Sequence, residues 1–288
     1  MKSIFRLLRY SLVLLILTVL LSACFKKPAT DDIKRLRISF NSFPNTVDPR
    51  KSADFISSTL ICMIFDGLSR NLPDGSVELA LAERFVMSPD QKTYTFYLRQ
   101  SFWSDGSQVT AFDFERSWKQ ILKPGYPSLC PYLFYCIKNA ENARNGRVEA
   151  DQIGIKALDN ATLQVTLERP TPYFLSLTAF PSFVPTPPDV AIELDSISGS
   201  KSLISNGPFL ISKIRPNAEI ILKKNGGYWN CNQIKLDEIQ ISIIRNEMTA
   251  WELFEHGELD WIGGAISPLP SDSMNWIAKH YNIQHSPM

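Results

Sequence analysis

Histidines and potential nucleophiles are the residues with which this sequence could carry out catalysis. Its three histidines, His256, His280 and His285, all lie late in the chain. Acid–base and nucleophilic catalysis need such a base beside an identifiable nucleophile and an orienting group. The sequence has no HExxH, GxSxG, P-loop or dinucleotide-binding signature that would provide this arrangement. We therefore expect that the protein is not an enzyme.

Four cysteines, Cys62, Cys130, Cys136 and Cys231, could form disulfides or bind a metal ion. Four thiols allow three complete pairings, and a bond between Cys130 and Cys136 would close a small loop. Buried free thiols are at least as good an interpretation. The spacing does not match a CxxC zinc knuckle and no histidine lies nearby, so we expect no metal site and no other cofactor.

A fifth cysteine, Cys24, follows an apolar segment near the start of the chain. Basic residues precede an apolar run at 12–21, which at about ten residues is too short to cross a bilayer. The segment Leu21-Ser22-Ala23-Cys24 resembles the lipobox of bacterial lipoproteins. It predicts a signal peptide at 1–23 and a lipid on Cys24 that anchors the mature chain to a membrane. The alternative is an ordinary secretory signal with a chance cysteine.

The charge balance argues against nucleic acid as a partner. The whole chain has 30 Lys plus Arg and 29 Asp plus Glu, and residues 1–23 contain three basic side chains and no acidic one. The remaining chain is therefore nearly neutral, with a slight acidic excess. Because binding to nucleic acid is driven by a basic excess, we exclude this class of partner.

The first half of the chain predicts a tether followed by alternating strands and helices. Residues 24–34 are polar, as expected of a disordered tether. Residues 37–40 read as extended, and 57–65 have the apolar spacing of a helix. Residues 93–99 alternate between two faces, which predicts a half-buried strand.

A turn and a capped helix are predicted next. Trp103-Ser104-Asp105-Gly106 would turn the chain, and the Thr110 hydroxyl would cap a helix at 111–122. The spacing of Phe114, Trp118 and Ile121 indicates a buried stripe on this helix.

The second half predicts two hairpins separated by a proline-rich connector. Residues 153–158 and 162–167 alternate across Asp159-Asn160, which is a hairpin signal. Six prolines in 170–188 favour a kinked, extended connector, where we place a domain crossing. The later segments predict a hairpin at 209–223, a strand at 239–243 and a helix capped by Thr249 that runs to Glu255 and stops at Gly257.

An ordered series of short motifs resembles one protein family. The series comprises Asp48-Pro49, Asp66-Gly67-Leu68, Leu79-Ala80-Leu81-Ala82-Glu83, the stretch 95–114, Ser205-Asn206-Gly207-Pro208-Phe209, Tyr228-Trp229 and Gly257-Glu258-Leu259-Asp260-Trp261. It is similar to the large peptide-type (family 5) solute-binding proteins of bacterial ABC importers. The resemblance implies a mixed α/β (α+β) fold, with a first lobe like that of type II periplasmic binding proteins and a small inserted domain.

The resemblance also implies a division into domains. Residues 35–65 and 188–288 would form a discontinuous first lobe, and 66–187 the inserted domain. Family members are longer by a second ligand-binding lobe, and the chain ends where it would cross into that lobe. We therefore expect a truncated form in which the second lobe is missing.

Ligand-binding residues follow from the same resemblance. The first lobe would contribute the loop Ser52, Ala53, Asp54 and Phe55, whose backbone groups would pair with an extended peptide. It would also contribute the turn Ser205, Asn206 and Gly207. The alternative is that this turn is structural, with Gly207 supplying a positive φ. The loop lacks the Glu that oligopeptide binders place near Ala53.

The expected protein is a lipoprotein in the periplasm or on the cell surface. It would capture oligopeptides and deliver them to an ABC permease and its ATPase subunits, and we expect the truncation to impair this function. One alternative is a non-transport surface lipoprotein that serves as an interaction scaffold, or as half of a split receptor with a complementary second-lobe polypeptide. A decaying gene product with an unpaired edge strand is another.

Overall fold

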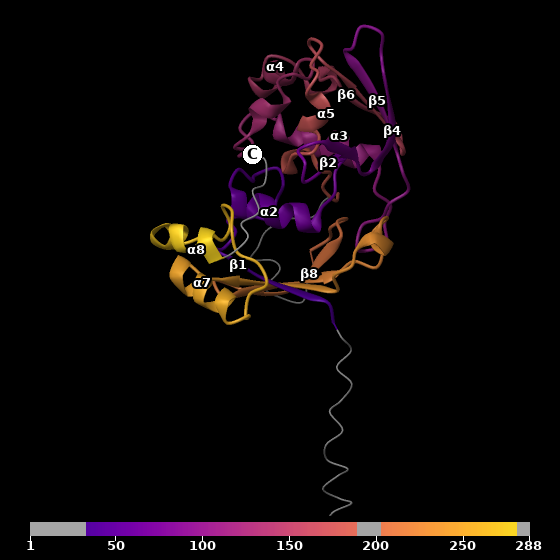
Figure 1. Ribbon diagram of the computed structural model, residues 1–288. Helices are drawn as coiled ribbons and strands as arrows, with labels where there is room; N and C mark the ends of the chain where they lie inside the picture. The colour runs from indigo at the N-terminus through magenta and orange to yellow at the C-terminus, as the bar shows by residue number, and fades with distance from the viewer. Residues whose placement is uncertain (1–32, 189–202, 281–288) are drawn as a thin grey trace, which may run out of the picture. The chain divides into compact units, whose positions relative to one another are not determined.

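The computed structural model of this protein describes residues 33–188 and 203–280 (Figure 1). The predicted signal peptide at 1–23, Cys24 and nearly all of the predicted tether lie outside the described residues. The strands are β1 (Arg35–Phe40), β2 (Ser69–Asn71), β3 (Val77–Leu79), β4 (Ala82–Met87), β5 (Thr93–Leu98), β6 (Ile155–Asp159), β7 (Thr162–Thr166), β8 (Phe209–Arg215), β9 (Glu219–Lys224) and β10 (Glu238–Ile243). The α-helices are α2 (Phe55–Ile64), α3 (Ala111–Ile121), α4 (Ala140–Arg144), α5 (Phe174–Leu177), α7 (Glu247–Glu255) and α8 (Met274–His280). The 3-10 helices are η1 (Pro131–Phe134), η2 (Ala150–Gln152), η3 (Pro181–Phe183), η4 (Cys231–Gln233) and η5 (Ser271–Ser273).

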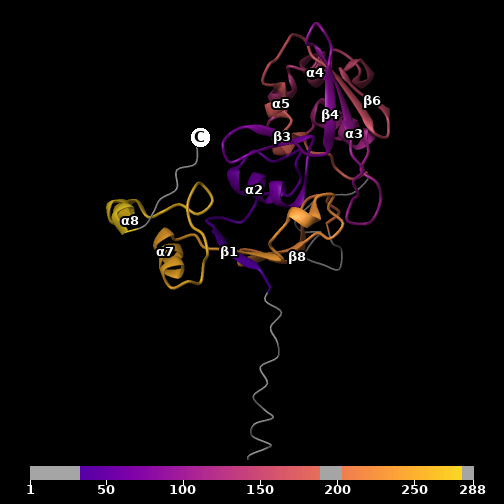
Figure 2. The ribbon, with the colours of Figure 1, turned by 45° about the vertical axis from the view of Figure 1, so that its right-hand side comes forward.

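One four-stranded sheet joins the start of the described chain to its late part. Its order is β1-β10-β9-β8, with β1 parallel to β10 and the other pairs antiparallel. The edge strands β1 and β8 are labelled in Figure 1 and Figure 2. In β10, Ile239 and Ile241 are buried while Gln240 between them is more exposed, as the period of two in a strand requires. The predicted hairpin at 209–223 is confirmed as β8 and β9, with Asn217 in the left-handed region at its turn.

A second four-stranded sheet, in the order β4-β5-β7-β6, is antiparallel throughout. It confirms the predicted strand at 93–99 and the hairpin around Asp159-Asn160. Its core face is aromatic: Tyr94 and Phe96 are buried, and the Tyr94 and Phe174 rings lie 5.1 Å apart. Large aromatic rings at such distances contribute both buried area and favourable ring contacts.

Helix α3 packs on β6 and β7 of this second sheet. Thr110 is its N-cap, as predicted, and the Asp113 carboxylate accepts a hydrogen bond from the Thr110 backbone N–H at 2.8 Å. Phe114, Trp118 and Ile121 are completely buried, so the predicted stripe is confirmed. The indole Nε1 of Trp118 donates to the Phe183 carbonyl at 2.8 Å, which ties α3 to the proline-rich segment.

Two local predictions are wrong. The proline-rich segment 170–188 is not simply extended, because it contains α5 and η3; Pro181 stands at the start of η3, where its fixed φ suits a helical turn. The N-cap of α7 is Asn246 rather than Thr249: its Oδ1 accepts from the Thr249 N–H at 2.9 Å, three residues inside the helix. The stop at Gly257 is confirmed by its positive φ of 70°.

The two four-stranded sheets draw on different parts of the sequence, and β2 and β3 form a separate two-stranded antiparallel sheet. One of the four-stranded sheets consists of β1, from 35–65, with β8, β9 and β10, from 203–280, and the other consists of β4, β5, β6 and β7. The mixed α/β fold class is thereby confirmed, while the division into a first lobe and an inserted domain stays a prediction. None of the helices in the described ranges has both the length and the apolar character needed to cross a membrane.

Candidate functional site

Two carboxylates fix the loop that precedes α2. Asp48 is buried, and its two oxygens accept from the Arg50 guanidinium at 2.8 and 2.9 Å. Asp54 is the N-cap of α2 and accepts from the Ser57 N–H at 2.8 Å. The Ser52 hydroxyl lies 3.0 Å from the Ser58 hydroxyl. The predicted binding loop is therefore held in place at both ends, and Phe55 already belongs to the helix.

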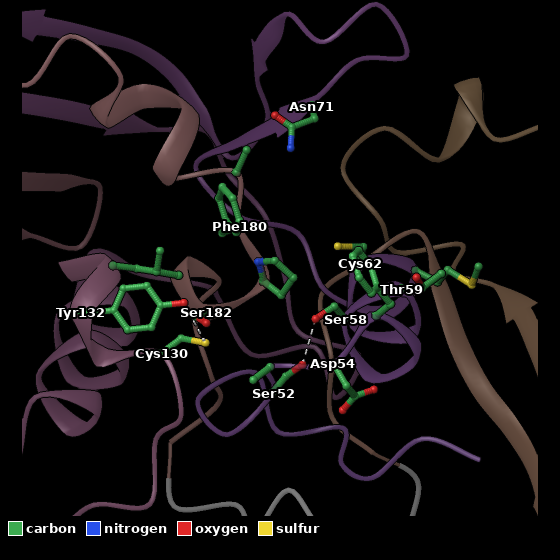
Figure 3. Close-up of a pocket in the computed structure, with 16 residues that line it drawn as sticks. Ser52, Asp54, Ser58, Thr59, Cys62, Asn71, Cys130, Tyr132, Phe180 and Ser182 are labelled. Atoms are coloured by element: carbon green, nitrogen blue, oxygen red, sulfur yellow. Dashed lines mark hydrogen bonds between the residues drawn. The ribbon is translucent and has the colours of Figure 1, made fainter. Parts of the chain in front are cut away.

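All four residues of this loop line a cavity of about 620 Å³. Its walls come from four places in the sequence: the loop with the first turns of α2, the end of β2, η1, and the segment leading into η3. Figure 3 shows Cys62 and Thr59 of α2 on one side and Tyr132 and Cys130 on the other, with Phe180 between them in this view. The lining residues are Ser52, Ala53, Asp54, Phe55, Ser58, Thr59, Cys62, Met63, Asn71, Cys130, Tyr132, Leu133, Ala179, Phe180, Pro181 and Ser182.

The cysteines of the described residues are all free thiols, so the alternative of a Cys130–Cys136 disulfide does not hold. Cys62 and Cys130 line the cavity, and the Tyr132 hydroxyl lies 3.9 Å from the Cys130 sulfur. Cys136 lies outside the cavity, and burial raises the pKa of its thiol to about 11. Within the described ranges, no group of three or more His, Cys, Asp or Glu side chains could hold a metal ion.

The turn Ser205, Asn206 and Gly207 does not line the cavity, although it was predicted alongside the loop. All three residues are buried. The Ser205 carbonyl accepts from the Ser104 N–H at 2.9 Å, and the Asn206 side chain both donates to the Asp66 carbonyl and accepts from the Asp66 N–H, each at 3.1 Å. Ligand contact by this turn stays a prediction. In the structure its backbone groups and the Asn206 side chain bind other parts of the chain, whereas the buried Ser205 Oγ has no hydrogen-bond partner among the described residues.

Glycine is needed at position 207 for a reason other than the expected one. Its φ is not positive. Instead, a Cβ at Gly207 would lie 2.3 Å from the Ile64 carbonyl carbon and 2.5 Å from the Phe65 nitrogen. The predicted positive φ is therefore wrong, and the requirement is close approach of two backbone segments.

Asp66 joins three of the sequence motifs in one buried network. Its Oδ2 accepts from the Tyr228 hydroxyl at 2.7 Å and from the Trp229 indole Nε1 at 2.9 Å. Arg70 donates to the Tyr228 hydroxyl at 3.1 Å, and the Arg99 guanidinium lies 3.9 Å from the centre of the Trp229 ring. Burial raises the pKa of the Asp66 carboxyl above its ordinary value, while the hydrogen bonds from Tyr228 and Trp229 oppose that effect. Tyr228 and Trp229 thus serve packing and support.

Sequence reasoning missed most of the cavity wall. Cys62, Cys130, Tyr132 and Phe180 come from segments far apart in the chain, and apolar residues in such segments were read as core or connector. The pattern that could have marked them is the pair of exposed aromatics, Tyr132 and Phe180, next to prolines that start helical turns. That pattern alone names no ligand.

The chain matches a family model described as "Bacterial extracellular solute-binding proteins, family 5 Middle" over residues 76–285. It is 35% identical to the oligopeptide-binding protein OppA of Bacillus subtilis, across 97% of this chain and 54% of the relative. The OppA structure from Burkholderia pseudomallei matches with a TM-score of 0.80 and 28% identity, over 87% of this chain and 49% of that one. The peptide-bound OppA of Listeria monocytogenes matches with a TM-score of 0.74 and 30% identity, over 80% and 46%. The chain thus spans about half the length of these relatives.

Proposed function

The chain belongs to the bacterial extracellular solute-binding proteins of family 5, and on this basis we propose that it captures oligopeptides outside the cytoplasm for an ABC importer. The relatives named above are oligopeptide-binding proteins, and one of them was solved with peptide bound. On this proposal the protein binds and delivers its ligand and performs no chemistry.

The cavity beside α2 is the single observation that carries this proposal. Its volume of about 620 Å³ lies in the range of roughly 300–1,000 Å³ typical of small-ligand sites. The loop Ser52–Phe55 forms part of its wall. A peptide in extended form could add alongside such a loop through main-chain hydrogen bonds while its side chains enter the cavity.

Membrane attachment and partners complete the proposal. Residues 1–23 would direct export, and a lipid on Cys24 would hold the mature chain at the membrane surface. The permease and ATPase subunits of the importer would then receive the peptide. Radiolabelled palmitate incorporation tests the anchor: the wild-type chain expressed in a bacterial host should be labelled, and Cys24→Ser should not.

The 288-residue polypeptide tested by itself should bind weakly. It spans about half the length of its relatives, and a peptide held against one wall leaves polar groups unmatched when they lose water. Each unmatched buried polar group costs about 1–3 kcal/mol. We propose that a polypeptide supplying the other half of the relatives' length raises the affinity.

Equilibrium binding of a mixed library of tri- to pentapeptides tests both statements. The chain from residue 24, carrying Cys24→Ser, is dialysed against the library, and retained peptides are identified by mass spectrometry. Weak retention that strengthens with the complementary polypeptide supports the proposal. Retention at micromolar affinity or tighter by the chain alone would refute the impairment, and no retention under either condition would refute peptide capture.

Exposed apolar side chains favour one alternative, in which the chain acts as a scaffold or as half of a split receptor. Met248, Trp261 and Met274 are 45%, 41% and 39% exposed, and all come from the last described part of the chain. Exposed apolar residues that gather on one surface mark a protein–protein interface, and these three are the candidates in this part of the chain. Co-purification distinguishes the alternatives, because a scaffold would retain a second polypeptide in the absence of any peptide ligand.

A further inference from the structure

The cavity wall is nearly free of charge. Among its sixteen residues are one carboxylate, that of Asp54, and no Lys, Arg or His. Asp54 accepts from the Ser57 N–H at 2.8 Å and lies 3.4 Å from the Asn45 amide nitrogen. No cation forms an ion pair with Asp54 among the described residues, so only these neutral donors and the N-terminal end of the α2 dipole offset its negative charge. Most of the remaining wall is apolar by area, and its neutral polar groups are the hydroxyls of Ser52, Ser58, Thr59, Tyr132 and Ser182 and the amide of Asn71.

Three large aromatic side chains in this wall are exposed to solvent. Phe55 is 74% exposed, Tyr132 61% and Phe180 44%, and they come from α2, η1 and the residue before η3. Phe180 lies between the two sides of the cavity in Figure 3. Each ring keeps apolar area in water that a ligand side chain would remove.

We infer that this cavity selects peptides by an apolar side chain, aromatic or branched aliphatic, and rejects an acidic one. The inference rests on the proposed function and names its substrate class. An apolar side chain would contact the rings and the aliphatic wall of Ala53, Met63 and Leu133. A carboxylate there would lose water, meet no cation and lie near Asp54, all of which disfavour its charged form.

The expected selectivity follows from the area that becomes buried. Full burial of a Leu or Phe side chain corresponds to roughly tenfold to a hundredfold in affinity. Because the cavity is open, we expect Ala-Phe-Ala and Ala-Leu-Ala to bind about tenfold more tightly than Ala-Ala-Ala. Ala-Asp-Ala should bind more weakly than Ala-Ala-Ala.

The cavity thiols provide a direct readout of where these ligands bind. Cys62 is exposed and lines the cavity, whereas Cys231 lies outside it. The surrounding wall desolvates the Cys62 thiol and, with a smaller contribution from Asp66, raises its pKa to about 11. The chain is therefore treated with iodoacetamide at alkaline pH, with and without each tripeptide, and alkylation of each cysteine is followed by peptide mass spectrometry. Ala-Phe-Ala should slow alkylation of Cys62 and leave the rate at Cys231 unchanged. Equal protection by Ala-Phe-Ala and Ala-Asp-Ala would overturn the inference and leave peptide capture intact.

Two amides without a peptide chain separate this inference from the proposed function. If no oligopeptide binds but N-acetyl-phenylalaninamide protects Cys62 and N-acetyl-aspartic acid amide does not, the apolar selectivity stands and peptide capture fails. If neither tripeptides nor amides protect Cys62, both are refuted.

A charge change at the rim tests the same wall without relying on loss of binding. Phe180→Lys should reverse the preference, so that Ala-Asp-Ala protects Cys62 better than Ala-Phe-Ala. Tyr173→Lys is the matched control, because Tyr173 is 59% exposed in the same proline-rich segment but does not line the cavity. An unchanged preference in Phe180→Lys, with the fold intact by circular dichroism, would contradict the inference.

Discussion

Removal of the Tyr228 hydroxyl should destabilise the fold more than its small size suggests. The hydroxyl donates to the buried Asp66 carboxylate at 2.7 Å and accepts from Arg70 at 3.1 Å. In Tyr228→Phe, Asp66 Oδ2 keeps the Trp229 indole at 2.9 Å, and Arg70 keeps Glu78 at 2.6 Å. The carboxylate therefore loses one donor while its charge stays buried.

The magnitude follows from the kind of bond that is lost. A hydrogen bond to a charged group contributes about 1.5–3 kcal/mol, and a buried acceptor without its donor retains the cost of lost hydration. We expect Tyr228→Phe to lower the free energy of unfolding by about 1.5–3 kcal/mol. For a chain of this size each kcal/mol corresponds to roughly 2–4 °C, so the melting temperature should fall by about 3–12 °C.

Urea and thermal unfolding, followed by tryptophan fluorescence and circular dichroism, measure this loss. Tyr173→Phe is the control, because that side chain is 59% exposed and its change should stay within about 0.5 kcal/mol. A double-mutant cycle with Asp66→Asn isolates the pair, and its coupling energy should account for most of the loss. A Tyr228→Phe effect no larger than that of Tyr173→Phe would show that Asp66 does not depend on this hydroxyl.

Three further predictions concern backbone packing, an ion pair and a thiol. Gly207→Ala should lower the free energy of unfolding in urea by at least about 1–3 kcal/mol, because its Cβ would lie 2.3 Å from the Ile64 backbone. Gly226→Ala is the control and should stay near wild type, because there is open space around Gly226. Equal effects of the two substitutions would refute the clash. The hydrogen bond from Arg37 lowers the pKa of Asp260. The pair therefore stabilises the folded protein fully above the ordinary carboxyl pKa of about 3.9, and this stabilisation is lost as pH falls through the lowered pKa. The stability difference between wild type and Asp260→Asn should therefore shrink on acidification, and a difference independent of pH would count against the pair. Burial raises the pKa of Cys136 to about 11, so its alkylation by iodoacetamide should be slow at neutral pH and accelerate as pH approaches that value; rapid labelling at neutral pH would contradict this.

Local structure was predictable where neighbouring residues determine it. The stripe Phe114, Trp118 and Ile121 and the cap Thr110 specify α3 within a dozen residues, because helix contacts recur at three and four positions. The cap of α7 was missed because Asn246 and Thr249 are both good N-cap residues three positions apart. Which of the two is the N-cap depends on where the preceding strand, β10, ends.

The site was predictable only in part, because its walls are joined by tertiary packing. The loop Ser52–Phe55 came from the family resemblance and does line the cavity. Tyr132 and Phe180 were not among the ligand-binding residues that the resemblance implied, and nothing local brings η1 and η3 to α2. The network of Asp66, Tyr228 and Trp229 was equally hidden, since its members are 162 and 163 residues apart in sequence.

The parallel pairing of β1 with β10 has a consequence for the chain during its synthesis. Arg35 and Glu238 are 203 residues apart, and ribosomes add about 5–20 residues per second. The first strand therefore waits roughly 10–40 s for its partner, with the apolar side chains of Ile38 and Phe40 uncovered. During that interval the uncovered strand is a binding site for a holdase chaperone. This sheet can then fold only after the chaperone has released the chain.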